Sequence, residues 1–195
     1  MKKPLSIILA TLLLAVACTA KQSRPETGAA DSDATPEKRV LVAYFSCTGT
    51  TEAAAKAIAG MAGADIYRIT PAREYTAADL DWRDKSSRAS VEMSNTKSRP
   101  ELAPPAAAIA NYDVIFVGYP IWGNTCPAII NTFMESANFD GKTVIPFATS
   151  GSSTIDNSEQ ALRKLYGAGI TWRAGKLIDA PEAGEVAEWV RSNIR

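Results

Sequence analysis

Hydrophobic residues fall into two patterns along the chain, continuous runs and one-sided stripes. Continuous apolar runs at 40–45, 113–118 and 143–148 are typical of strands that are buried on both faces of a sheet. Residues 65–70 alternate between apolar and polar, which predicts a strand nearer the edge of the sheet. The run at 170–178 predicts a fifth strand.

Helical stripes lie between and after these strands. An alanine-rich helix is predicted at 51–61, a second helix opens at Pro127, and two more are predicted at 158–166 and 181–194. Strands that alternate with helices imply a parallel sheet with helices on both faces, so the predicted fold class is α/β. The folded domain is expected to span 39–195.

The connection at 71–111 is longer than a crossover between two parallel strands requires. A crossover helix is predicted at 104–110. The rest of the connection is expected to form an irregular excursion or a small subdomain, and long connections of this kind often carry function.

The N-terminus has the features of an export signal. Lys2 and Lys3 precede an apolar run of 13 residues that ends in small side chains, which predicts a signal peptide at 1–17 and is too short to favour a membrane span. The small residues before Cys18 resemble a bacterial lipobox, so Cys18 is expected to be lipidated; a plain secreted protein and an uncleaved anchor are the alternatives. Residues 18–38 have few apolar side chains and are predicted to be a disordered tether. The domain is therefore expected to be exported and lipid-anchored on the periplasmic or outer side of a bacterial membrane.

Composition narrows the possible chemistry. The 195 residues include 21 basic and 21 acidic side chains, without the basic excess expected of a nucleic-acid-binding protein. The sequence has no histidine, which excludes His-based general bases and Ser-His-Asp triads. Its three cysteines are too few and too scattered for a disulfide framework or a metal cluster.

A segment rich in hydroxyl groups follows the first predicted strand. Residues 46–51 (SCTGTT) lead directly into a helix, so hydroxyls and free amides at a helix N-terminus can bind a phosphate group there. The segment lacks the lysine of a Walker loop and the pattern G-x-G-x-x-G. A tyrosine phosphatase using Cys47 would need arginine where the chain has Ala53. The alternative to a phosphate site is an ordinary turn rich in Ser and Thr.

Two further segments have the chemistry of a ring-binding site. Trp122 follows the third predicted strand and precedes Gly123 and Asn124, so a flat aromatic surface adjoins backbone that can approach a ring edge. Residues 149–153 (TSGSS), after the fourth strand, are small and rich in donors. Packing would explain Trp122 alone, and a turn would explain 149–153 alone. The coincidence of three such segments at strand ends predicts one ligand site.

Three stretches of the chain resemble the flavodoxin family: 44–51 (YFSCTGTT), 118–122 (GYPIW) and 146–151 (PFATSG). The resemblance runs from about 39 to 195. It implies a flavodoxin-like three-layer sandwich that has a five-stranded parallel sheet in the order 2-1-3-4-5 and binds FMN at the strand ends. It also implies which residues hold the cofactor, without any metal ligand or catalytic residue: the phosphate is assigned to Ser46, Thr48, Gly49, Thr50 and Thr51, the isoalloxazine to Pro120, Ile121, Trp122, Gly123 and Asn124, and its other side to Thr149, Ser150, Gly151 and Ser152.

Two positions depart from similar proteins, which usually have asparagine in place of Thr50 and a second aromatic residue in place of Gly123. The glycine would leave one face of the ring open to a substrate. The same resemblance places the loops with Cys47 and Cys126 after neighbouring strands. Two separate thiols are expected, and a disulfide between them is the alternative.

The resemblance implies an FMN protein that transfers electrons to or from a redox partner protein or a small-molecule acceptor such as a quinone. One alternative is an FMN-dependent NAD(P)H:quinone oxidoreductase, in which 71–111 supplies a substrate wall with Tyr75, Trp82 and Arg99 as candidates; surface packing is the competing role for each. Another is a lipid-anchored domain that kept the fold and lost the flavin. The three strand-end segments contain no Asp or Glu, so we expect a less negative potential than strongly acidic flavodoxins have.

Overall fold

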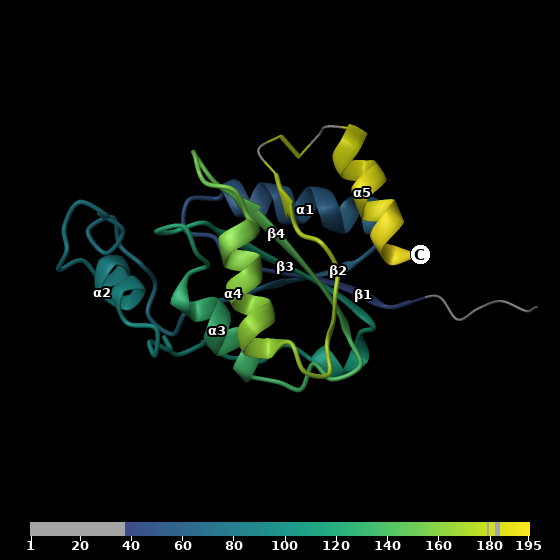
Figure 1. Cartoon of the computed structure of the whole chain (residues 1–195), viewed down its shortest axis with the longest axis horizontal. Helices are drawn as coiled ribbons and strands as arrows, with labels where there is room; N and C mark the ends of the chain where they lie inside the picture. Colours follow the sequence, from purple (N-terminus) through teal and green to yellow (C-terminus); the bar gives the residue numbers. More distant parts are fainter. Residues whose placement is uncertain (1–37, 179, 182–183) are drawn as a thin grey trace, which may run out of the picture. The chain divides into compact units, whose positions relative to one another are not determined.

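A computed structural model describes residues 38–178, 180–181 and 184–195 (Figure 1). The predicted signal peptide, Cys18 and all of the predicted tether except Lys38 lie outside these residues. In the described part, the strands are β1 (Val40–Tyr44), β2 (Asp65–Arg68), β3 (Val114–Pro120), β4 (Thr143–Thr149), β5 (Thr171–Trp172) and β6 (Lys176–Leu177).

Helices follow most of these strands, as the stripes predict. They are α1 (Thr50–Ala62), α2 (Arg88–Ser94), α3 (Ala128–Glu135), α4 (Asp156–Tyr166) and α5 (Gly184–Ile194), with a short 3-10 helix η1 (Ile109–Asn111). None of the helices in the described ranges is long and apolar enough to cross a membrane.

The strands form one parallel sheet in the order β2-β1-β3-β4-β5, which confirms the predicted fold class and strand order. The three continuous apolar runs are the central strands β1, β3 and β4, where nearly every side chain is buried. β2 lies at one edge, and its Ile66 is 46% exposed, in agreement with its alternating pattern.

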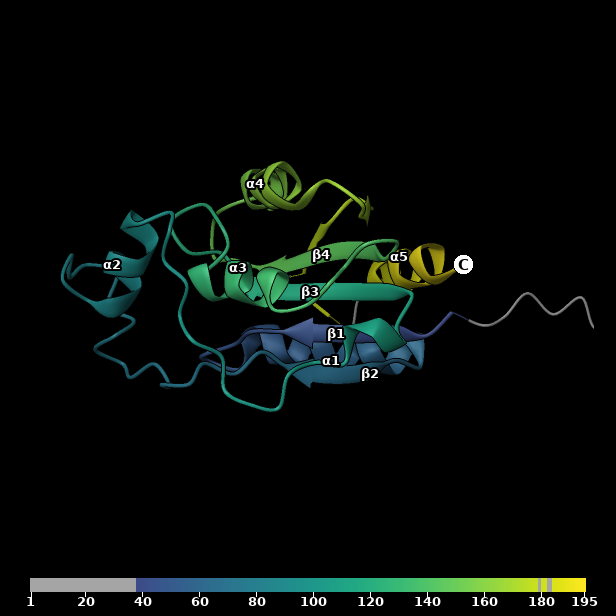
Figure 2. The ribbon, with the colours of Figure 1, turned by 90° about the horizontal axis from the view of Figure 1, so that it is seen from below.

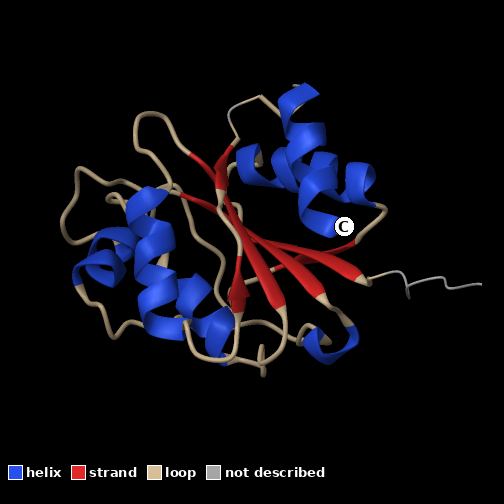
Figure 3. Cartoon of the chain, turned by 45° about the vertical axis from the view of Figure 1, so that its right-hand side comes forward, coloured by secondary structure: helices blue, strands red, loops and turns tan. Residues whose placement is uncertain are grey.

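Helices cover both faces of the sheet, and each face has its own core (Figures 2 and 3). One core joins alternate residues of the central strands to α1 and α5, through residues such as Ile58 and Val190. The other core joins the intervening strand residues to α3 and α4, through residues such as Phe133 and Leu162. This division follows from the alternation of side chains along a strand.

The predicted strand at 170–178 is interrupted, which corrects the sequence-based prediction. Its two pieces, β5 and β6, pair with different parts of β4. The carbonyls two residues before and two residues after Pro146 both accept hydrogen bonds from the β5–β6 side. Because the backbone polar groups of every second residue face the same neighbouring strand, the amide position of Pro146 also faces that side, and proline has no N–H to donate there. The amide of Gly175 instead donates to Glu159 Oε2 at 2.8 Å.

The predicted helix at 104–110 is also wrong, because only η1 forms at the end of that stretch. Pro104 and Pro105 explain the error: each lacks an amide donor, and a proline disfavours the helical conformation of the residue before it. Earlier in the connection, Pro71 and Leu102 form an antiparallel bridge that closes the base of a long loop. This loop, 71–102, contains α2, which Figures 1 and 2 both show beyond the end of the sheet.

Candidate functional site

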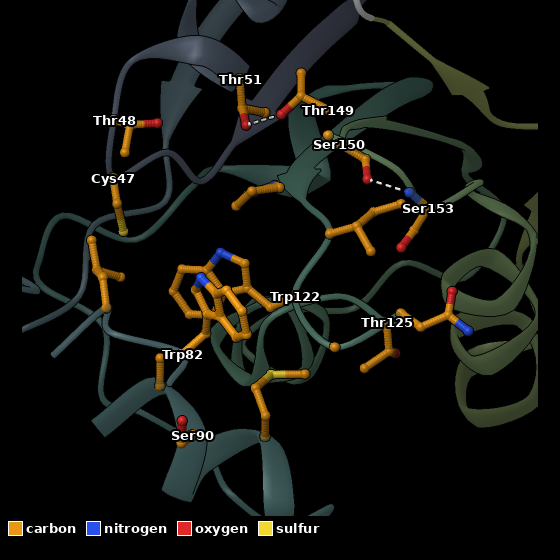
Figure 4. A pocket seen from close by; sticks show the side chains of 18 of the residues that line it. Cys47, Thr48, Thr51, Trp82, Ser90, Trp122, Thr125, Thr149, Ser150 and Ser153 are labelled. Carbon is orange, nitrogen blue, oxygen red and sulfur yellow. Dashed lines mark hydrogen bonds between the residues drawn. The ribbon is translucent and has the colours of Figure 1, made fainter. Parts of the chain in front are cut away.

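One open pocket lies where the carboxyl ends of β1, β3 and β4 meet the loop 71–102 (Figure 4). Its volume of about 1230 Å³ exceeds the roughly 300–1,000 Å³ that is usual for a small-molecule site. The predicted residues at the strand ends line it: Ser46, Thr48, Thr50, Thr51, Pro120, Ile121, Trp122, Gly123, Asn124, Thr149, Ser150, Gly151 and Ser152. Gly49, the remaining predicted residue, does not line the pocket and is the N-cap of α1.

The segment after β1 is shaped by Gly49. Its φ of +90° is a left-handed conformation that favours glycine, and it turns the chain from the strand into α1. The Gly49 amide donates to Ser46 Oγ at 3.1 Å, which holds the turn closed. No side chain caps α1.

The first turn of α1 consequently presents free donors. Among the described residues, the amides of Thr48, Thr50, Thr51 and Glu52 have no hydrogen-bond acceptor. Free amides and the positive end of the helix dipole favour an anion at this point.

A buried hydrogen bond joins the first segment to the third. Thr51 Oγ1 and Thr149 Oγ1 lie 2.8 Å apart, and both residues are buried (Figure 4). In the third segment, Ser150 Oγ accepts from the amides of Ser152 at 3.2 Å and Ser153 at 2.8 Å. The hydroxyl-rich loops are therefore held in place by their own side chains, and they form one polar side of the pocket.

The segment after β3 makes a tight turn. Trp122 and Thr125 exchange two amide-to-carbonyl bonds of 3.0 Å, and the two residues between them, Gly123 and Asn124, have φ values of +52° and +67°. Two consecutive positive φ angles define a type I′ turn, for which Asn and Gly are the favoured residues. A Cβ at Gly123 would meet nothing within 4 Å, so this turn leaves open space beside it.

Trp122 is half-buried and packs edge-on against two other aromatic rings. Its ring centre lies 5.6 Å from that of Phe45 and 5.5 Å from that of Tyr75. An ion pair holds Tyr75 in turn: the Tyr75 hydroxyl donates to Glu92 Oε2 at 2.5 Å, and the Arg88 guanidinium lies 3.9 Å from the Tyr75 ring centre. Burial is the main cause that raises the pKa of Tyr75, so the hydroxyl stays protonated.

Loop 71–102 supplies the opposite side of the pocket, which the sequence predicted only in part. The lining side chains from this loop are those of Leu80, Trp82, Lys85, Ala89, Ser90, Met93 and Ser94. Trp82 was a candidate, whereas the others gave no signal beyond the length of the connection. Tyr75 lies behind Trp122, and neither it nor Arg99 lines the pocket.

Arg99 has a structural role. Its guanidinium forms two hydrogen bonds of 2.8 Å with the carboxylate of Glu135 in α3, and the Tyr166 hydroxyl donates to the same carboxylate at 2.7 Å. The hydrogen bond from Arg99 is the main cause that lowers the pKa of Glu135. This network fastens the end of the loop to α3 and α4.

Both cysteines near the site are free thiols, as expected. Burial raises the pKa of Cys47 and that of Cys126 to about 11 each. A thiol in such surroundings is protonated near neutral pH and is a poor nucleophile. The pocket is therefore suited to binding, and no described residue in it is an activated thiol.

The donor set fits a ligand with a phosphate at one end and a planar ring at the other. Hydroxyls and free amides surround the start of α1, and Trp122 with the adjoining turn offers an apolar wall. Within the described ranges, Lys85 is the only charged residue that lines the pocket, so the phosphate is to be bound by neutral donors and the helix dipole.

The doubly wound sheet and its strand-end pocket define an α/β protein that binds a ligand at the point where the strand order reverses. A flavodoxin family model matches residues 39–193, and the chain belongs to that family. The resemblance expected from the three sequence stretches is thus confirmed. No curated protein sequence matches the chain significantly.

Two solved structures are similar in sequence and fold. A Bacteroides uniformis protein, named provisionally as a flavoprotein, is 54% identical, with a TM-score of 0.76 over 79% of this chain and 98% of its own. A Bacteroides eggerthii protein with the same provisional name is 46% identical, with a TM-score of 0.77 over 81% of this chain and 99% of its own. A Lactobacillus acidophilus flavoprotein in complex with FMN shares the fold at 20% identity and a TM-score of 0.61, over 78% of this chain and 98% of its own.

Proposed function

We propose that this chain binds one FMN and transfers electrons. The observation that carries the proposal is the convergence of three strand-end segments on one pocket, with uncapped amides at the start of α1 and Trp122 on the wall. Membership of the flavodoxin family and an FMN complex of a protein with the same fold support the choice of FMN. Bound FMN would supply the one- and two-electron chemistry, and the protein's part is to bind and orient it.

Each segment has a separate task in this proposal. The hydroxyls and free amides of 46–51 bind the phosphate, while the left-handed conformation of Gly49 turns the chain into α1 and so places these groups at the helix N-terminus. Residues 120–124 lie along the ring, and the donors of 149–152 lie on its other side. The absence of carboxylates among the described lining residues favours the less negative potential expected above.

An absorption spectrum of the purified protein tests the cofactor directly, because bound flavin has visible bands. Titration of the apoprotein with FMN and with riboflavin then separates phosphate binding from ring binding. We expect FMN to bind at least about 10-fold more tightly, since hydrogen bonds to a charged group contribute roughly 1.5–3 kcal/mol each. Thr48→Ala should weaken FMN and leave riboflavin unchanged, and Thr154→Ala, outside the pocket, should change neither. A colourless protein that ignores added FMN would support the flavin-free alternative.

We also propose that the domain is exported and held at a membrane surface by lipid on Cys18. The apolar run before Cys18 and the small residues next to it support this proposal. Expression in a bacterium that processes lipoproteins should place the wild-type protein in the membrane fraction. Cys18→Ser should remove the lipid mass from the N-terminal peptide and release the protein. Equal membrane association of both forms would contradict the proposal.

A further inference from the structure

The two sides of the pocket differ in chemistry. Most of the lining hydroxyls and all of the lining glycines lie on the strand-end side, together with the apolar residues 120–122. The loop side combines four apolar side chains with one ammonium group and two hydroxyls: Leu80, Trp82, Ala89, Met93, Lys85, Ser90 and Ser94. Figure 4 shows Thr51 and Thr149 on one side of Trp122 and Ser90 on the other. The volume of about 1230 Å³ is above the usual range for one small ligand, roughly 300–1,000 Å³. The pocket thus has both the room and the chemical division for a second ligand.

Trp82 is the most exposed large apolar side chain in the described part of the chain, at 73%. It packs against no other aromatic ring there, and only the Arg83 guanidinium lies over it, at 5.4 Å from the ring centre. A side chain of this kind has one face free for a flat ligand. Its position in the pocket lining, opposite the strand-end side, places that surface where a second ring would enter.

Lys85 gives this side a positive charge. Among the described residues it makes no ion pair, and no carboxylate lines the pocket to neutralise it. An ammonium group beside an apolar wall suits a flat aromatic molecule that carries an electron-poor carbonyl or an anionic substituent. It would also favour negative charge on that carbonyl oxygen during reduction.

We propose that Leu80, Trp82, Lys85 and Met93 form the acceptor subsite of this protein, and that the acceptor is a small quinone. This inference rests on the proposed FMN function. The quinone accepts two electrons and two protons and leaves as the hydroquinone. Bound dihydro-FMN would supply both electrons and both protons and would itself be oxidised to FMN. Gly123 has open space around its Cβ position, which leaves room for the quinone next to the cofactor.

The test uses oxidised holoprotein and anthraquinone-2-sulfonate, so that binding is measured by calorimetry without electron transfer. We expect the dissociation constant to rise about 2- to 10-fold in Trp82→Ala, from the lost stacking. The dissociation constant should rise about 2- to 5-fold in Lys85→Gln and return to the wild-type value in Lys85→Arg. At high salt the difference between wild type and Lys85→Gln should disappear. FMN affinity should stay within about 2-fold of wild type in each variant.

Two matched controls lie on the same loop outside the pocket lining. Val91→Ala removes an exposed apolar surface and Lys97→Gln an exposed charge, and neither should change quinone binding. Loss of FMN affinity in Trp82→Ala would assign this wall to the cofactor and overturn the inference. A yellow holoprotein that does not bind the quinone would refute the inference alone. A wild-type protein that takes up no FMN would refute the proposed function and, with it, the acceptor subsite.

Discussion

Replacing Tyr75 with phenylalanine removes a single hydroxyl, which joins two parts of loop 71–102, and keeps the ring that packs against Trp122 in the wall of the pocket. That hydroxyl donates to Glu92 Oε2 at 2.5 Å, and Arg88 Nε donates to the other carboxylate oxygen at 2.6 Å. The side chains of Arg88 and Glu92 are only 14% and 12% exposed. The phenylalanine ring keeps the contacts with Trp122 and Phe45, so the variant isolates one hydrogen bond to a largely buried carboxylate.

The expected loss of unfolding free energy is about 2 kcal/mol, because a hydrogen bond to a charged group contributes roughly 1.5–3 kcal/mol and solvent screens this one little. Tyr75→Leu should lose about 2 kcal/mol more. It removes the ring under the Arg88 guanidinium, worth roughly 0.5–2 kcal/mol, and two edge-on aromatic contacts of roughly 0.5–1.5 kcal/mol each, which leucine packing offsets in part.

Urea unfolding followed by circular dichroism measures both variants, with an unchanged m value as the sign of two-state behaviour. Tyr112→Phe is the matched control, because its hydroxyl donates to Asp65 Oδ2 at 2.9 Å in an exposed setting. This control should lose less than about 0.5 kcal/mol. Equal losses in Tyr75→Phe and Tyr112→Phe would refute the reasoning, since burial would then not strengthen the Tyr75 contact.

Three other changes test separate parts of the structure. Gly49→Ala should lower the free energy of unfolding by about 1–2 kcal/mol and weaken FMN binding, because an L residue at φ +90° is strained. Gly60→Ala is the control, at a helical site with open space, and should do neither. Urea unfolding and fluorescence titration with FMN compare the two variants. The Arg99 hydrogen bonds hold the pKa of Glu135 below its ordinary value of 4.5, so their contribution to stability is present above pH 4.5 and is lost as pH falls below it. In Arg99→Gln, the free energy of unfolding measured at a series of pH values should therefore fall less steeply in acid than in wild type. Burial raises the pKa of Cys47 to about 11, so Cys47 should react with iodoacetamide at pH 8 at least about 10-fold more slowly than an unperturbed thiol of pKa 9.0. FMN should slow the reaction further, and peptide mass spectrometry that finds rapid labelling would contradict this.

The central sheet was predictable because burial on both faces leaves a direct mark on the sequence. β1, β3 and β4 coincide with continuous apolar runs, and α1 and α4 lie within a few residues of their predicted ranges. The break between β5 and β6 was not predictable from local pattern. Pro146 is visible in the sequence, but the side of the strand on which its missing N–H falls depends on the pairing of β4.

The strand-end side of the pocket was predictable for a similar reason. Parallel strands bring their carboxyl ends to one edge, so hydroxyl-rich segments after β1 and β4 must lie near Trp122 once the strand order is known. The loop side was not predictable. Lys85 and Met93 line the pocket in a loop that is held by side-chain contacts over long sequence distances, and these contacts leave no periodic pattern.

The two sides of the pocket are therefore held in different ways, and this difference bears on how the protein would work. The strand-end side is fixed by the backbone hydrogen bonds of the sheet and the buried Thr51–Thr149 pair. The loop side depends on two side-chain anchors, the contacts of the Tyr75 ring with Phe45 and Trp122 and the Arg99–Glu135 pair. Weakening an anchor should move the proposed acceptor subsite, while the strand-end side, where FMN is proposed to bind, stays in place. Affinity for the acceptor can then change without loss of the cofactor, which is the separation that a protein with a permanent cofactor and an exchanging substrate requires.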